Sequence, residues 1–128
     1  NPETLSTKQV LIIDTIGLLT KLYHYAAVAY IGGGMGTTGL HNTLEAAVFG
    51  VPIIIGKNYD RFPEAKAMLA QGGLVSVQDA SSFKKSLDAF VEDENFRHAC
   101  GQKNKAYVGK NKGATALITE KIQAMLTV

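Results

Sequence analysis

Residues 32–47 of the chain read GGGMGTTGLHNTLEAA, and this stretch forms the centre of a strand–loop–helix unit. Its five glycines follow the apolar run Ala26–Ile31 and come just before a helix start. Such a loop exposes backbone N–H groups and directs the positive end of the next helix toward a ligand. Glycine also lets a ligand approach the main chain, because it has no Cβ and adopts positive φ at little cost. The stretch therefore predicts a site for an anionic group such as a phosphate.

Strands and helices alternate on both sides of this unit. Short apolar runs predict four buried strands, at Val10–Ile13, Val28–Ile31, Val51–Ile55 and Leu74–Val77. Helices are expected at residues 18–26, Thr43–Phe49, Pro63–Ala70, Ser81–Val91, Glu94–Tyr107 and Ala114–Leu126, with Gly109–Gly113 as a flexible connector. Continuously apolar strands are typical of a parallel sheet buried on both faces. We predict an α/β fold: a Rossmann-like parallel sheet of about four strands with helices on both faces.

Composition sets limits on size and chemistry. A chain of 128 residues with 46% apolar and 19% charged residues fits one folded domain, covering residues 1–128. The net charge of +2 gives no argument for a nucleic-acid partner. The single Cys100 excludes an internal disulfide, and the three scattered histidines suggest no metal site. No apolar segment approaches the roughly 20 residues that span a bilayer.

Asn42 and Glu45 stand three residues apart at the predicted helix start, and two interpretations stay open. In the structural one, Asn42 caps the first turn and Glu45 reaches back to the backbone, as in a capping box. In the functional one, Glu45 accepts hydrogen bonds from the two ribose hydroxyls and Asn42 lies beside a phosphate. Residues 34–39 also match GxGxxG, but the expected acid after the next strand is missing, since Asp60 lies several residues past Ile55. A nicotinamide or flavin cofactor is therefore disfavoured.

Several motifs at fixed spacing resemble one family. These motifs are DTIG at residues 14–17, IGGG at 31–34, HNTLEAA at 41–47 and GVP at 50–52, followed by Gly56. Through them the chain resembles the C-terminal half of bacterial Kdo (3-deoxy-D-manno-octulosonic acid) transferases. The resemblance runs from about Val10 to Met125. It implies a GT-B glycosyltransferase whose Rossmann-like C-terminal domain binds the donor CMP-Kdo. It also implies Kdo transfer to a lipid A precursor in lipopolysaccharide synthesis at the cytoplasmic face of the inner membrane, with no metal or redox cofactor.

The resemblance also implies roles for particular residues. Ile16 and Gly17 would lie by the nucleotide base, the glycine loop and Asn42 by the phosphate and sugar, and Glu45 would hold the ribose hydroxyls. The full implied set for binding the nucleotide sugar is Ile16, Gly17, Gly33, Gly34, Met35, Gly36, Thr37, Thr38, Gly39, Asn42 and Glu45. Many relatives carry a cation in the glycine loop, where this chain has Thr37 and Thr38. Backbone N–H groups, these two hydroxyls or Lys57 would have to replace that cation.

In the family, the general base and the acceptor site belong to an N-terminal domain. This chain begins with polar residues and without methionine, so we expect an excised fragment that contains no catalytic residue and transfers no Kdo alone. Two alternatives stay open: a GT-B transferase that uses a UDP-sugar, and a non-catalytic nucleotide-binding module.

The strand order expected for this fold is 3-2-1-4-5-6. By resemblance, Val10–Ile13 corresponds to strand 3 and the later strands to 4, 5 and 6, so the centre of the sheet would lie before Asn1. Val28–Ile31 would then be an exposed apolar edge, which is a template for pairing. We predict that Val10–Ile13 moves in beside it, or that two copies form a homodimer through this edge.

Overall fold

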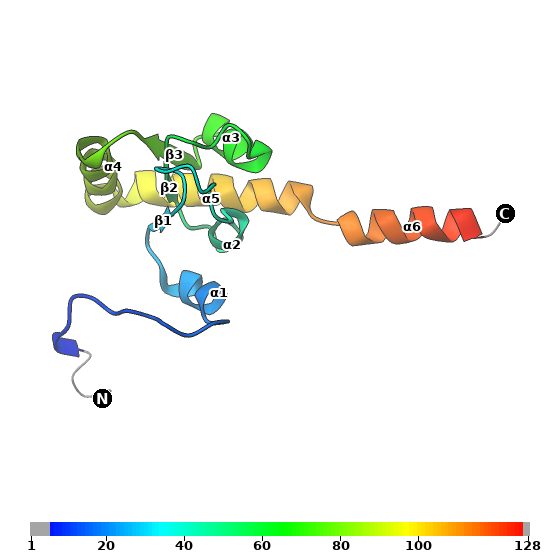
Figure 1. The fold of residues 1–128 in the computed structure, drawn as a ribbon, viewed down its shortest axis with the longest axis horizontal. Coiled ribbons are helices and arrows are strands. Elements are labelled where there is room, and N and C mark those ends of the chain that lie inside the picture. The colour runs from blue at the N-terminus through cyan, green and yellow to red at the C-terminus, as the bar shows by residue number, and fades with distance from the viewer. Residues whose placement is uncertain (1–5, 127–128) are drawn as a thin grey trace.

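The computed structural model describes residues 6–126, and its centre is a parallel sheet of three strands (Figure 1). The strands are β1 (Ala29–Ile31), β2 (Ile53–Gly56) and β3 (Leu74–Val77), in the order β1-β2-β3. Ala29 is in register with Ile53, which is in register with Leu74. The three isoleucines of β2 are completely buried because this strand has a neighbour on each side and helices on both faces.

Helices cover both faces of the sheet, as the apolar strands predicted. The helices are α1 (Leu19–Leu22), the 3-10 turn η2 (Tyr23–Tyr25), α2 (Leu44–Ala47), α3 (Pro63–Ala70), α4 (Ala80–Glu92), α5 (Glu94–Asn111) and α6 (Ala114–Leu126). Ile53 and Ile55 pack in one core cluster with residues of α2 and α3. Ile54 points to the opposite face, where it joins Phe90 of α4 and Cys100 of α5. The fold class is therefore the predicted α/β arrangement, with three strands rather than four.

Helix α5 is fixed to the sheet by a buried asparagine and a close backbone contact. The Asn104 amide donates to the carbonyl of Val51, at 2.8 Å, and to that of Gly73, at 2.7 Å. One turn earlier, Gly101 lies so close to Gly50 that a Cβ on Gly101 would come within 1.9 Å of the Gly50 oxygen. These contacts join α5 to the chain just before β2 and just before β3.

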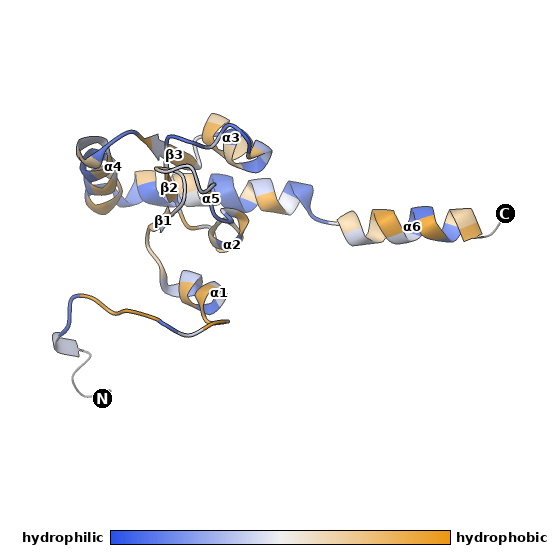
Figure 2. Cartoon of the chain, in the orientation of Figure 1, coloured by the Kyte–Doolittle hydropathy of each residue, from blue (hydrophilic) through white to orange (hydrophobic). Residues whose placement is uncertain are grey.

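The prediction of a strand at Val10–Ile13 is wrong. This segment has no strand geometry, and Val10 and Ile12 are 78% and 83% exposed. It runs apart from the sheet, as the blue trace in Figure 1 shows, although its residues are among the most apolar in Figure 2. A strand is stabilised by a hydrogen-bonded neighbour, and the strand order expected for this fold does not make this segment a neighbour of β1. The predicted move beside β1 is thus also wrong.

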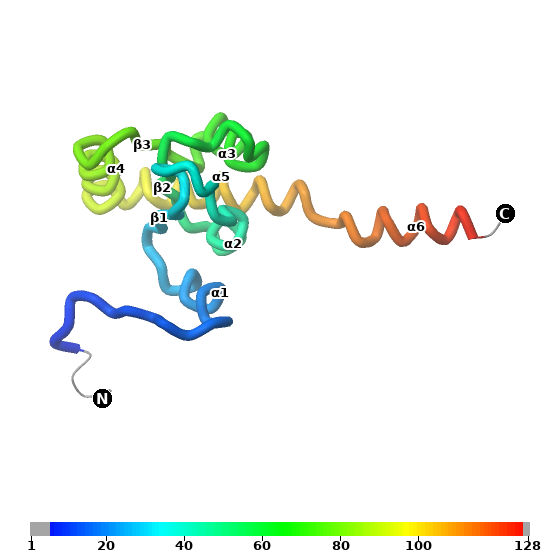
Figure 3. The backbone as a smooth tube through the Cα atoms, viewed as in Figure 1, coloured from blue at the N-terminus to red at the C-terminus, as the bar shows by residue number. Residues whose placement is uncertain are grey.

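Other element boundaries differ at helix ends. The predicted helix at residues 18–26 is divided into α1 and η2, and α2 covers only Leu44–Ala47. The predicted connector Gly109–Gly113 is mostly helical, because α5 continues to Asn111. The bounds of α3, β3 and α6 agree with the prediction. Helix α6 projects away from the domain (Figure 3), and its apolar side chains at Leu117 and Ile122 are exposed.

Candidate functional site

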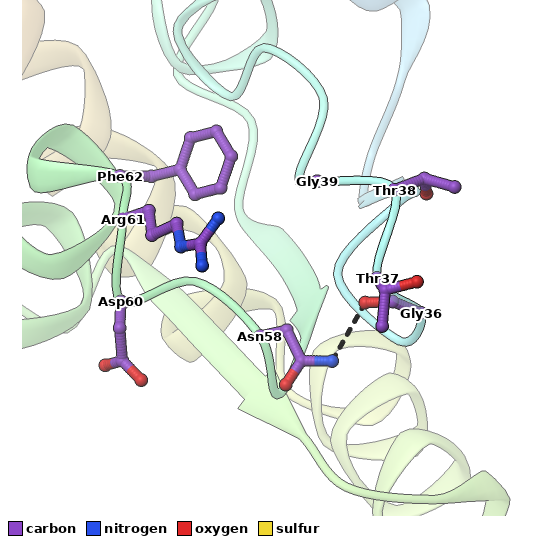
Figure 4. A pocket seen from close by; sticks show the side chains of 8 residues that line it. All are labelled: Gly36, Thr37, Thr38, Gly39, Asn58, Asp60, Arg61 and Phe62. Atoms are coloured by element: carbon purple, nitrogen blue, oxygen red, sulfur yellow. Dashed lines mark hydrogen bonds between the residues drawn. The ribbon is translucent and has the colours of Figure 1, made fainter.

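A pocket of about 410 Å³ lies outside the carboxyl ends of β1 and β2 (Figure 4). One wall is the second half of the glycine loop that follows β1, and the other is the loop between β2 and α3. The lining residues are Gly36, Thr37, Thr38, Gly39, Asn58, Asp60, Arg61 and Phe62. Ligands of open α/β sheets bind at this end of the strands, because the loops that follow neighbouring parallel strands meet there.

The shape of the glycine loop depends on close backbone contacts. Gly33 has a φ of +85°, and a Cβ on it would come within 1.9 Å of the Gly39 oxygen. A Cβ on Gly56, the last residue of β2, would come within 2.3 Å of the Gly34 carbonyl carbon. Only glycine fits at both positions. The loop therefore folds back on itself and lies directly against the end of β2.

Asn58 fixes this loop through two hydrogen bonds. Its backbone N–H donates to the Gly34 carbonyl at 2.8 Å, and its side-chain amide donates to the Gly36 carbonyl at 2.9 Å. The second bond is the dashed line in Figure 4. Asn58 thus positions the glycine loop against the β2–α3 loop, and its amide nitrogen is already used in doing so.

Asn42 and Glu45 form a linked pair beyond the loop. The Asn42 Oδ1 accepts from the Leu44 N–H at 3.0 Å, and the Asn42 Nδ2 donates to Glu45 Oε1 at 3.1 Å. The expected capping of the first turn by Asn42 is therefore present as an Asx turn, whereas Glu45 bonds the Asn42 side chain instead of reaching back to the backbone. Burial raises the pKa of the nearby Tyr23 phenol, and the negative charge of Glu45 raises it further.

The structure brings together only part of the predicted site. Gly36–Gly39 line the pocket, whereas Asn42 and Glu45 are not among its lining residues. Ile16 and Gly17 lie in the exposed N-terminal segment, away from the sheet (Figure 1). Met35 lines a second, smaller cavity of about 270 Å³ between β1, β3 and α4.

Sequence reasoning missed the contribution of the β2–α3 loop, which supplies Asn58, Asp60, Arg61 and Phe62. The signal was available, because this loop follows the carboxyl end of a strand that neighbours β1 in a parallel sheet. Lys57, the proposed substitute for the missing loop cation, does not line the pocket, whereas Asp60, rejected as the acid of a dinucleotide site, does.

Residues 6–126 contain neither a metal-binding cluster nor a membrane-spanning helix. No group of three or more metal-ligating side chains occurs among them. None of the helices formed by these residues is long and apolar enough to cross a membrane.

A parallel sheet covered on both faces, with a glycine-rich loop and a pocket at the carboxyl ends of its strands, defines a Rossmann-like ligand-binding domain. The family model described as "Glycosyl transferases group 1" matches residues 6–107. The chain therefore belongs to this family of glycosyltransferases.

Two proteins of similar sequence are named as Kdo transferases. The chain is 29% identical over 120 residues to the 3-deoxy-D-manno-octulosonic acid transferase of Haemophilus influenzae, covering 92% of this chain and 28% of that protein. It is 30% identical over 101 residues to the enzyme of the same name from Chlamydia pneumoniae, covering 77% and 23%. The chain thus spans about a quarter of the length of these relatives.

A solved structure shares the fold. The crystal structure of the C-terminal CMP-Kdo binding domain of WaaA from Acinetobacter baumannii matches with a TM-score of 0.73 at 23% identity, covering 80% of this chain and 54% of that one. The arrangement of sheet and helices described above is therefore a fold that a solved structure also has.

Proposed function

We propose that this chain is the donor-binding part of a Kdo transferase and that it binds CMP-Kdo in the pocket beside the glycine loop. The pocket itself carries the proposal: Gly36–Gly39 form one wall of it, at the end of the sheet where such folds hold ligands. The similarity to Kdo transferases along most of the chain supports the choice of donor. A UDP-sugar donor and a non-catalytic nucleotide-binding role are the alternatives.

The bound donor would use the groups present at this site. Backbone N–H groups of the glycine loop and the hydroxyls of Thr37 and Thr38 would face the phosphate, and the Glu45 carboxylate would hold the ribose hydroxyls. Fixed donors of this kind stabilise the negative charge that develops on CMP as the sugar departs. Helix α2 adds little to this, because it has only four residues and aligns few peptide dipoles.

The proposal extends to the protein in which this domain works. A lipid A precursor would be the acceptor, held by an N-terminal domain at the cytoplasmic face of the inner membrane, and no metal or nucleic acid would take part. We still predict that two copies of the chain pair through the open edge of β1, because β1 has β2 as its single neighbour among the described strands.

Titration of the chain with CMP, UMP and NAD⁺ tests the proposed donor. We expect CMP to bind more tightly than UMP, and NAD⁺ to show no saturable binding, in isothermal titration calorimetry. Tighter binding of UMP would favour a UDP-sugar donor. Binding of NAD⁺ alone would contradict both a CMP-Kdo donor and a UDP-sugar donor.

The Glu45→Ala variant tests whether Glu45 holds the ribose hydroxyls. Hydrogen bonds to a charged group contribute about 1.5–3 kcal/mol each, so we expect CMP affinity to fall by roughly tenfold or more. The melting temperature without CMP should change little, because Glu45 bonds only the exposed Asn42 amide. Glu92→Ala, on the exposed surface of α4, is the matched control. Unchanged CMP affinity in Glu45→Ala would leave Glu45 with a structural role only.

A further inference from the structure

Arg61 places a positive charge in the pocket wall that faces the glycine loop. Figure 4 shows its guanidinium directed into the space between the β2–α3 loop and Gly39. Neither of the two ion pairs found in residues 6–126 involves Arg61, and no hydrogen bond occupies it in this part of the chain. A guanidinium with five N–H donors is therefore available to a ligand.

Arg61 supplies the positive charge of this pocket. Asp60 also lines the pocket, but its carboxylate points away from both Arg61 and the glycine loop in Figure 4. Lys57 does not line the pocket. Hydrogen bonds from Ser82 lower the pKa of the Asp79 carboxyl most strongly, and the charge of Lys57 lowers it further. Arg61 is thus the single positively charged residue among those that line the pocket.

The opposite wall of the pocket is uncharged. Thr37 and Thr38 are exposed residues of the wall across the pocket from Arg61, and their hydroxyls are directed away from Arg61 in Figure 4. The Asn58 amide lies between the two walls but already donates to Gly36. An acidic group in this space would therefore meet the guanidinium on one side and the uncharged wall formed by Gly36–Gly39 on the other.

We propose that Arg61 is a ligand-binding residue that holds an acidic group, a phosphate or a carboxylate, of a nucleotide-linked sugar in this pocket. The planar guanidinium matches both groups, since it forms paired hydrogen bonds to two oxygens. This inference rests on the proposed function and deepens it, because it assigns the positive charge of the site to the β2–α3 loop. The acidic group belongs either to the nucleotide, as its phosphate, or to the sugar, as its carboxylate.

Calorimetric titration of the whole chain with three probes tests Arg61. Cytidine carries neither acidic group, CMP carries the phosphate, and CMP-N-acetylneuraminate carries a phosphate and a sugar carboxylate. The variants are Arg61→Gln, which removes the charge, and Arg61→Lys, which keeps the charge but loses the paired geometry. Lys66→Gln removes one exposed charge from α3 outside the pocket and is the matched control. Melting curves confirm that each variant is folded.

We expect Arg61→Gln to weaken binding roughly tenfold to a hundredfold, the range for a lost charge-assisted hydrogen bond, with Arg61→Lys between it and the unmodified chain. Weaker binding of CMP with unchanged binding of cytidine assigns Arg61 to the phosphate. Unchanged CMP binding with weaker binding of CMP-N-acetylneuraminate assigns it to the sugar carboxylate. Arg61→Gln behaving like Lys66→Gln for every probe would overturn the inference while leaving the proposed function intact.

The proposed function fails separately if the unmodified chain does not bind CMP. UDP is then titrated into the same variants, and weaker binding to Arg61→Gln would keep Arg61 as an acid-binding residue in a site with a different nucleotide. Binding of neither nucleotide to the unmodified chain would overturn both proposals.

Discussion

Replacing Asn104 by alanine is expected to lower the free energy of unfolding by about 2–6 kcal/mol, which would take much of the stability of an ordinary domain. The side chain is completely buried and donates to two carbonyls, those of Val51 and Gly73. An unpaired buried acceptor costs about 1–3 kcal/mol, and this substitution leaves two. The Asn104 Oδ1 has no hydrogen-bond partner among the described residues, so losing it offsets part of the cost. We therefore expect a value in the lower half of the range.

Urea denaturation of Asn104→Ala and Asn111→Ala measures this effect. Asn111 lies on the same helix and donates to the Tyr107 carbonyl, but it is exposed, so water can replace its hydrogen bond. We expect the Asn111→Ala midpoint to stay near that of the unmodified chain and the Asn104→Ala midpoint to fall sharply. Equal midpoints for the two variants would show that α5 is not fixed to the sheet through Asn104.

The sequence pattern predicted the centre of the fold well because burial on both faces leaves a clear signal. Ile53–Ile55 is continuously apolar, Leu74–Val77 is apolar except at Ser76, and both segments form strands of the parallel sheet. Val10–Ile13 has the same local pattern but no strand beside it, and a local pattern does not report whether a partner exists. The end of α5 was placed too early because Gly109 is a poor helix former, yet α5 continues past it to Asn111.

At the candidate site, the sequence pattern predicted the glycine loop but not the β2–α3 loop that faces it across the pocket. The glycines between Gly32 and Gly39 mark a loop after a strand, and the second half of that loop forms one wall of the pocket. Arg61 is separated from Thr38 by more than twenty residues, and only the parallel pairing of β1 with β2 brings their loops together. That Gly36–Gly39 and Glu45 bind a nucleotide sugar remains a prediction.

Gly33→Ala is expected to abolish the shape of the glycine loop and, with it, CMP binding. Alanine at a φ of +85° is strained by about 1–2 kcal/mol. Its Cβ would also lie 1.9 Å from the Gly39 oxygen and 2.8 Å from the His41 ring, so the backbone must move apart. Because Gly39 lines the pocket, that movement changes the binding site directly.

Gly32→Ala is the matched control, since a Cβ at Gly32 meets no atom within 4 Å. It is next to Gly33, makes the same chemical change, and should leave CMP affinity and the urea midpoint close to those of the unmodified chain. The comparison therefore separates loss of loop shape from loss of glycine in general. If Gly33→Ala binds CMP as tightly as Gly32→Ala, the nucleotide is held elsewhere, and the pocket beside Gly36–Gly39 is not the donor site.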